Sequence, residues 1–365
     1  MFELTNAQRL CFALPPVLDT WEKVEVKPGP YDMWNMYAYL EGRKIVKVIR
    51  ICEEDGHEMY NEFAVDRRVS EDGIKLLPKT AKGKPVNFTT SNLTKCTPVG
   101  MELYYTNGSV TLSNHASNQC FYRSIYEGVK INNFTSFISW VEDWCGNTGE
   151  NEQTEINGFA SRTKSHQPFK EGDFFRYRIN RTLYGYGRIL LDFAKMRKEG
   201  TPFWDMFMGK PLCVAIYHIA TADAHMSPEQ LVGRKMQPSH MIMDNIFYYG
   251  ECEIIGNKPL VAAEEDYPIH YGSQKADRLN YQCGKLFVSL ENEKALYPFF
   301  QNGGIGWSLK VALPILNECI RCDSNEPYWN MTHPFEVIQD LRNPKFCKVL
   351  EQIQRQMGIE CDARI

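Results

Sequence analysis

The sequence predicts an α+β protein in two parts, built largely from antiparallel, twisted β-sheets or partly closed barrels, with C-terminal helices. The chain has 365 residues, which is enough for two domains of ordinary size. It is 43% hydrophobic and 13% aromatic, and a high aromatic content is typical of sheet faces. Segments of strand character separated by turn residues fill most of the chain, whereas helical periodicity is confined to its end.

Residues 1–150 are expected to form a β-rich N-terminal domain of unknown role. Residues 34–40 and 44–51 have the character of two strands joined by a turn at Glu41-Gly42. The strongest hairpin signal is Asn107-Gly108 between two apolar runs, because this dipeptide supplies the positive φ angles of a tight turn. Residues 76–85 are basic and interrupted by Pro and Gly, which predicts an exposed loop.

The rest of the chain is expected to contain a linker and two further parts. Residues 151–167 are polar and predict a flexible linker. Residues 168–275 predict an α+β domain with strands at 173–179, 184–191, 211–217, 246–249 and 252–255, and a short helix that begins at Ser227-Pro228. Residues 276–365 predict a mostly helical part packed on that domain, with helices at 306–320 and 334–357 and a break at Asn343-Pro344.

Charge and composition argue against nucleic-acid and membrane partners. The 41 basic and 45 acidic residues give a net charge of −4, and no segment is a Lys/Arg run. No apolar stretch approaches the ~20 residues that a membrane span needs. The N-terminal segment lacks a basic region and a cleavage site, so we expect a cytoplasmic protein whose 12 cysteines are reduced.

No spacing of residues predicts a catalytic centre, a cofactor or a metal site. Cys319-x-x-Cys322 lies near the end of an expected helix and has no second ligand pair nearby. His218, Asp223 and His225 match no helical ligand pattern. Two alternatives to a protein-binding role stay open: an enzyme of unrecognised type, such as a metal-dependent hydrolase that uses these three residues, and a carbohydrate-binding protein.

A run of carboxylates, Glu264-Glu265-Asp266, is followed by Tyr267-Pro268. Three adjacent carboxylates repel one another and are often a solvated face. The same run can also dock a basic partner by electrostatic attraction.

Several short motifs in one order resemble the bacterial immunity protein 26 family of polymorphic-toxin systems. The first is a Gly-Asp-x-Phe strand that begins at Gly172, and the second is the strand Tyr184-Gly-Tyr-Gly-Arg188. The others are the apolar strand at 212–217, Tyr249-Gly250, residues 255–260, Asp266-Tyr-Pro268 and Tyr271-Gly272. The resemblance covers about residues 169–272.

The resemblance implies an α+β fold and an intracellular protein that neutralises a cognate toxin domain by direct binding, without catalysis. Gly185 and Gly187 share one side of their strand and are expected to leave a shallow groove there. The residues expected to contact the partner are Asp173, Tyr184, Tyr186, Arg188, Glu264, Glu265, Asp266 and Tyr267.

Overall fold

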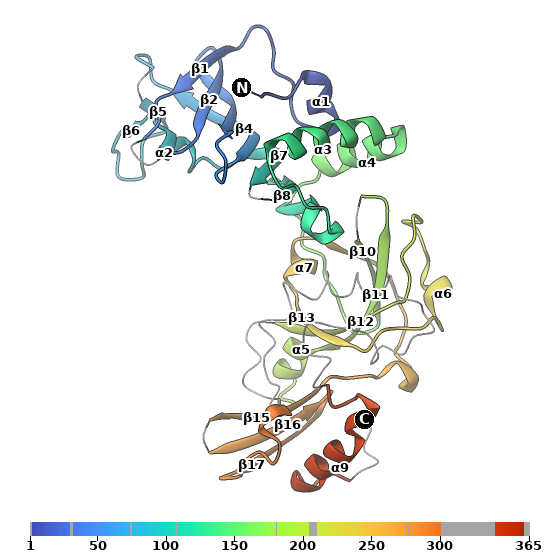
Figure 1. Cartoon of the computed structure of the whole chain (residues 1–365). Helices are drawn as coiled ribbons and strands as arrows, with labels where there is room; N and C mark the ends of the chain where they lie inside the picture. The colour runs from blue at the N-terminus through green and yellow to red at the C-terminus, as the bar shows by residue number, and fades with distance from the viewer. Residues whose placement is uncertain are drawn as a thin grey trace. The chain divides into compact units, whose positions relative to one another are not determined.

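A computed structural model of the chain contains two compact units, Met1–Ser165 and His166–Ile365 (Figure 1). It describes residues 2–29, 32–73, 75–106, 108–179, 181–203, 210–275, 277–300 and 340–360. We describe each unit by itself.

The first unit is built on one antiparallel sheet. In spatial order, the described strands are β1 (Glu22–Val26), β2 (Asn35–Glu41), β3 (Lys44–Cys52), β4 (Met59–Val69), β7 (Val99–Thr106), β8 (Ser109–Asn114) and β9 (Gln119–Arg123). Two short strands, β5 (Lys75–Leu77) and β6 (Val86–Asn87), extend the sheet from the end of β4. The β7–β8 hairpin confirms the turn predicted at residues 107–108, because Thr106 pairs with Ser109.

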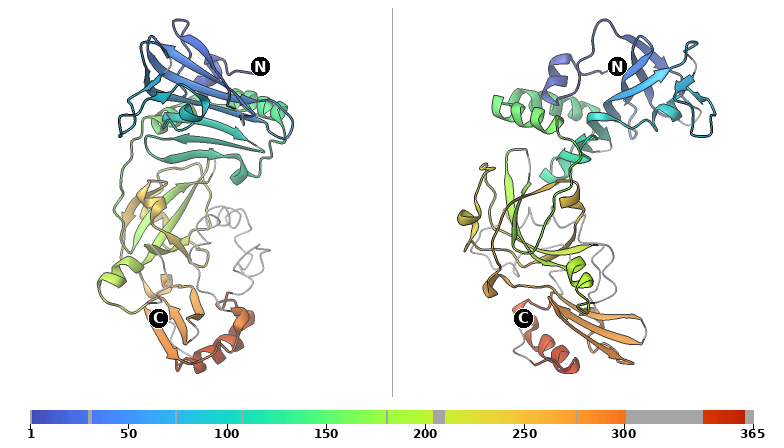
Figure 2. Two further views of the ribbon diagram at one scale, coloured as in Figure 1. Left: turned by 90° about the vertical axis from the view of Figure 1, so that its left-hand side faces the viewer. Right: turned by 180° about the vertical axis from the view of Figure 1, so that it is seen from behind.

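Helices cover part of this sheet. They are α1 (Asn6–Cys11), α2 (Thr90–Leu93), η1 (Ser124–Glu127), α3 (Phe134–Asn147) and α4 (Glu150–Ala160). Asn133 caps α3 by accepting a hydrogen bond from the Ser136 amide, and the apolar side chains of the helix recur at helical spacing toward the sheet. The ring of Phe137 stacks on Tyr105 of β7 with centroids 4.6 Å apart. Figure 2 shows α3 and α4 side by side along the sheet.

Helix α4 replaces most of the expected linker. Ile156 and Phe159 are buried in the core of the first unit, and the side-chain amide of Asn114 donates to the Phe159 carbonyl at 2.8 Å. The first unit therefore continues to Ser165. The polar residues of this segment occupy the solvent side of a helix, and its two apolar anchors are too few for sequence periodicity to reveal.

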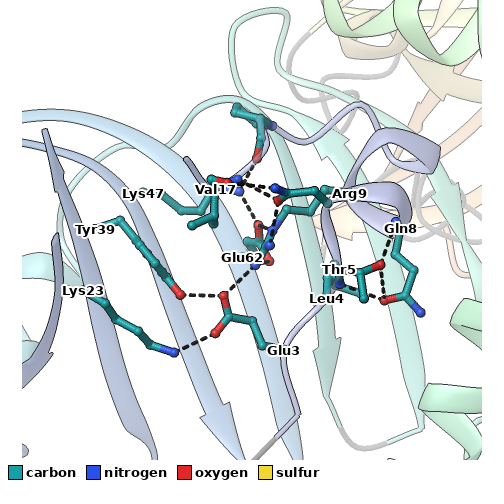
Figure 3. A network of polar contacts seen from close by, with 12 residues as sticks. Glu3, Leu4, Thr5, Gln8, Arg9, Val17, Lys23, Tyr39, Lys47 and Glu62 are labelled. Carbon is teal, nitrogen blue, oxygen red and sulfur yellow. Dashed lines mark hydrogen bonds and ion pairs between the residues drawn. The ribbon is translucent and has the colours of Figure 1, made fainter. Parts of the chain in front are cut away.

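A buried charge network holds the N-terminal segment on the sheet (Figure 3). The Nε of Arg9 lies 2.7 Å from Glu62 Oε1, and Tyr60 donates to the other Glu62 oxygen at 2.5 Å. Lys47 forms an ion pair with the same carboxylate, and Arg9 also contacts Glu3 at 2.9 Å. Burial lowers the pKa of the Lys47 amine, although Glu62 opposes that shift. Removing one member would therefore leave buried charge uncompensated.

The second unit contains two antiparallel sheets in its described residues. The first has the spatial order β13 (His240–Met243), β12 (Pro211–Ile216), β11 (Tyr184–Asp192), β10 (Asp173–Arg178) and β14 (Cys252–Asn257). The second consists of β15 (Ile269–Lys275), β16 (Arg278–Cys283) and β17 (Leu286–Glu291). The helical elements are α5 (Phe193–Lys198), α6 (Pro228–Leu231), α7 (Asn245–Tyr248), η2 (Ala262–Glu264), η3 (Pro298–Phe300), η6 (Pro344–Phe346) and α9 (Cys347–Gln356).

The predicted α+β class is confirmed, and the sheets of the described residues are open rather than closed into barrels. The expected strand at 246–249 is wrong, because these residues form the single-turn helix α7, which buries Ile246 and Phe247. Residues 278–291, expected in a mostly helical part, form β16 and β17, and Tyr281 of β16 belongs to the core that includes Ile353 of α9. The expected helix at 306–320 lies outside the described residues.

Candidate functional site

The Gly-Asp motif before β10 forms a turn that joins two distant segments. Gly172 has a φ of +81°, and a side chain there would collide with the Lys258 carbonyl. The backbone amide of Lys258 donates to the Gly172 carbonyl at 3.0 Å. The Asp173 carboxylate accepts hydrogen bonds from the Lys170 amide at 2.7 Å and from the Asn257 side chain at 2.8 Å. Asp173 is buried, so its visible role is to close this turn.

The expected groove over the glycines of β11 is not present. Gly187 pairs with Phe175 and Gly185 pairs with Tyr177, and the aromatic ring of each partner lies over its glycine. A Cβ at Gly187 would also lie 2.8 Å from Ile216 Cδ1. Both positions require glycine because rings from β10 occupy the space that a larger side chain would need. The core therefore fills this face of β11.

The two tyrosines of the same strand are also structural. The ring of Tyr184 lies under two guanidinium groups, those of Arg178 at 4.8 Å and Arg176 at 5.6 Å. The hydroxyl of Tyr186 donates to the Asp223 carbonyl at 2.5 Å. Both tyrosines are buried, which leaves them little surface to offer a partner.

Arg188 connects β11 to the acidic run. Its side chain is 1% exposed, and its Nε and Nη2 atoms each lie 3.0 Å from an oxygen of Glu264. The Nη2 atom also donates to the Lys258 carbonyl at 3.1 Å and to the Pro259 carbonyl at 3.0 Å. The guanidinium lies 4.1 Å from the centre of the Phe174 ring. This buried ion pair, in which Nη2 donates the hydrogen bond to Glu264, fixes the loop that leads to η2.

A second buried arginine holds the other end of the run. Arg342 Nη1 lies 2.8 Å from Asp266 Oδ2, and Arg342 Nη2 lies 2.7 Å from Asp340 Oδ2. The Ser239 amide also donates to Asp266 at 2.9 Å. Burial lowers the pKa of Arg342, but the opposite effect of the Asp340 and Asp266 carboxylates is larger. The pKa of Arg342 therefore lies above its ordinary value. Through its hydrogen bonds to Ser239 and Asp266, Arg342 thus ties the C-terminal segment to the residue before β13 and to the acidic run.

Between these two anchors the chain exposes a short surface, which we call the acidic loop (residues 261–266). Val261 is 58% exposed, and Ala262, Ala263 and Glu265 are exposed beside it. Glu264 is directed to Arg188, whereas Asp266 keeps 48% of its side chain exposed while it pairs with Arg342. The loop therefore presents an exposed apolar side chain next to a carboxylate, between two ion pairs.

The structure therefore separates the eight expected contact residues. Five are buried in the second unit: Asp173, Tyr184, Tyr186, Arg188 and Tyr267. Tyr267 packs in the apolar cluster that contains Cys213 and Met241. The other three, Glu264, Glu265 and Asp266, lie in the acidic loop. Sequence motifs did not reveal Val261, which stands out by its exposure, or Arg342, whose role depends on contacts made across the fold.

The residues of the alternative hydrolase do not gather into a metal-binding group. Asp223 Oδ1 accepts a hydrogen bond from the His225 amide at 2.7 Å, as in a local turn. Burial and nearby Lys235 lower the pKa of the His218 ring. Across the described part of the chain, no three His, Cys, Asp or Glu side chains are arranged to hold a metal ion. The Cys319-x-x-Cys322 pair lies outside the described residues.

Three of the motifs that carry the resemblance thus meet at one place, where Gly172, Arg188 and the 258–264 segment are joined by hydrogen bonds. Residues 170–283 match the family model of Immunity protein 26. The Immunity protein 26 segment begins at the turn of Gly172 and ends with β16, eleven residues beyond the 272 that we expected. It covers less than a third of the chain. No curated protein and no solved structure matches the chain.

None of the described helices is both long enough and apolar enough to cross a membrane.

Proposed function

We propose that this chain is an intracellular, cytoplasmic immunity protein that neutralises a toxin domain by binding it directly. The observation that carries the proposal is the Immunity protein 26 match, which covers the acidic loop and Arg188 but not Arg342. Neutralisation of this kind requires an accessible, complementary surface and no catalytic group or cofactor.

The acidic loop is the proposed contact surface. Val261 would supply the apolar centre, and Glu265 would supply a charge at its edge that attracts a basic toxin surface. Arg188 and Arg342 act as positioning residues, because they order the loop before the partner arrives and so lower the entropic cost of association.

The test uses the full chain and toxin domains encoded beside its gene. Each toxin domain is expressed alone and with the chain, cell growth is scored, and the Kd of the purified pair is measured by calorimetry. We expect Val261→Asp to weaken binding about ten-fold or more, which corresponds to about 1.4 kcal/mol. Glu265→Lys should weaken binding mainly through slower association, and this effect should shrink at high salt.

Two variants serve as matched controls. Val232→Asp places a charge on a 49% exposed valine outside the loop, and Glu293→Lys reverses an exposed carboxylate elsewhere in the second unit. Both should leave the Kd unchanged. If the two loop variants bind as tightly as these controls, the loop is not the contact surface. If no neighbouring toxin domain is bound or neutralised, the immunity role itself is refuted.

A further inference from the structure

We propose that the first unit binds the phosphate backbone of nucleic acid through a basic lobe. The basic lobe comprises residues 67–95: the end of β4, the β5–β6 hairpin with its connecting loop, and α2 with the residues that follow it. It lies outside the Immunity protein 26 segment, so its ligand is independent of the toxin proposed above.

The charges of the first unit are strongly segregated. Residues 67–95 contain seven Lys and Arg side chains and only two carboxylates, Glu71 and Asp72. The first unit as a whole contains 18 basic and 21 acidic residues, so the remainder of the unit is strongly acidic. A positive surface on an otherwise negative unit attracts polyanions to one place.

The cations of the lobe are free to meet a ligand. Next to the lobe, Arg43 pairs with Glu71 at 2.8 Å and Lys44 pairs with Asp66 at 3.2 Å. In the part of the chain that the structure describes, six cations of the lobe have no acidic partner: Arg67, Arg68, Lys79, Lys82, Lys84 and Lys95.

The strands of the lobe place two of its cations on one face. Leu76 of β5 pairs with Val69 of β4, and both side chains are buried in the core. Because side chains alternate along a strand, Arg68 and Lys75 occupy the opposite, outer face. In the connecting loop, the Thr80 amide donates to the Lys84 carbonyl at 2.9 Å, and the Gly83 amide donates to the Thr80 carbonyl at 2.7 Å.

The chemistry of the lobe favours a phosphate backbone over a protein or a membrane. Protein interfaces centre on exposed apolar or aromatic side chains, and segments that bind membrane surfaces insert such side chains into the bilayer. Among the described residues of the lobe, no large apolar side chain is strongly exposed. Cations interspersed with hydroxyl groups such as those of Thr80 and Ser91 are what phosphate contacts require. The sequence argued against nucleic acid because the net charge is −4 and no segment is a Lys/Arg run; the seven cations of the lobe are dispersed over 29 residues of one continuous segment.

The test measures binding of the full chain to a fluorescein-labelled mixed-sequence DNA duplex of about 20 base pairs by anisotropy. If about six phosphates are neutralised, the Kd should weaken about a thousand-fold between about 50 and 200 mM salt. The variant Lys79→Glu/Lys82→Glu/Lys84→Glu should weaken binding at about 50 mM salt by at least about a hundred-fold and reduce the salt dependence by about three counterions.

The matched control is Lys130→Glu/Lys198→Glu/Lys285→Glu, which changes the net charge equally at exposed lysines outside the lobe. This control should bind within about three-fold of the parent protein. Equal loss of affinity in both triple variants, or absence of duplex binding at about 50 mM salt, overturns the proposal. Equally tight binding to polyglutamate or to phosphatidylserine vesicles also overturns it, because either result assigns the lobe to an acidic protein or a membrane.

Discussion

Replacing Arg188 with methionine should destabilise the second unit strongly while leaving the first unit unchanged. Methionine preserves most of the apolar stem that packs near Phe174, but it removes the charge that pairs with Glu264. Breaking a buried ion pair by removing one partner costs about 3–5 kcal/mol. The carbonyls of Lys258 and Pro259 lose their donor as well. For a unit of this size, the melting temperature should fall by roughly 6–20 °C.

Differential scanning calorimetry checks this prediction, since the transition of the first unit serves as an internal control. The double variant Arg188→Met/Glu264→Gln removes both charges and should recover about 1–2 kcal/mol of the loss. Two results would show that the ion pair does not anchor the loop. One is an Arg188→Met variant that melts at the same temperature as the parent protein. The other is a double variant whose loss of stability equals the sum of the losses caused by the two single substitutions.

Three further predictions concern the core and the charge networks. Gly187→Ala should lower the free energy of unfolding by about 1–3 kcal/mol in urea titrations, because its methyl group overlaps the Phe175 ring; an unchanged midpoint would mean that the ring can move aside. Burial raises the pKa of Asp340, but Arg342 outweighs this effect and holds it below the ordinary value. Its contribution to stability is therefore present above about pH 4 and lost as the pH falls through the folded-state pKa. Asp340→Asn should flatten the acid side of a plot of melting temperature against pH, and an equally steep decline would contradict that assignment. Glu62→Gln leaves two buried cations in the first unit without their carboxylate and should cost about 3–5 kcal/mol in the transition of that unit; a cost below about 1 kcal/mol would argue against a buried network.

The motif residues that carry the family resemblance are mainly determinants of the fold. Gly172 allows a close backbone approach, Gly187 makes room for an aromatic ring, and Arg188 binds a carboxylate and carbonyls of a distant loop. Partner recognition is proposed for residues such as Val261 and Glu265, which stand out only by exposure.

The strands and turns of this protein could be predicted because their signals are local. The strands that became β2, β3, β10, β11 and β12 follow from their apolar and aromatic runs, and the β7–β8 turn follows from Asn107-Gly108. The errors arose where local signals were weak. Helix α4 has two core anchors in eleven residues, and α7 is an apolar run too short to distinguish from a strand.

By itself, the sequence determined the α+β class, eight of the 17 described strands and the order of motifs that match Immunity protein 26. Only the tertiary structure decided what those motifs do. Arg188 and Glu264 are 76 residues apart, as are Asp266 and Arg342, and both pairs depend on which strands and loops become neighbours. The rings that cover the β11 glycines come together in the same way. The local pattern of apolar residues determines where a strand forms. Which residues become neighbours in space depends on the order of the strands, their register and the burial of whole sheet faces.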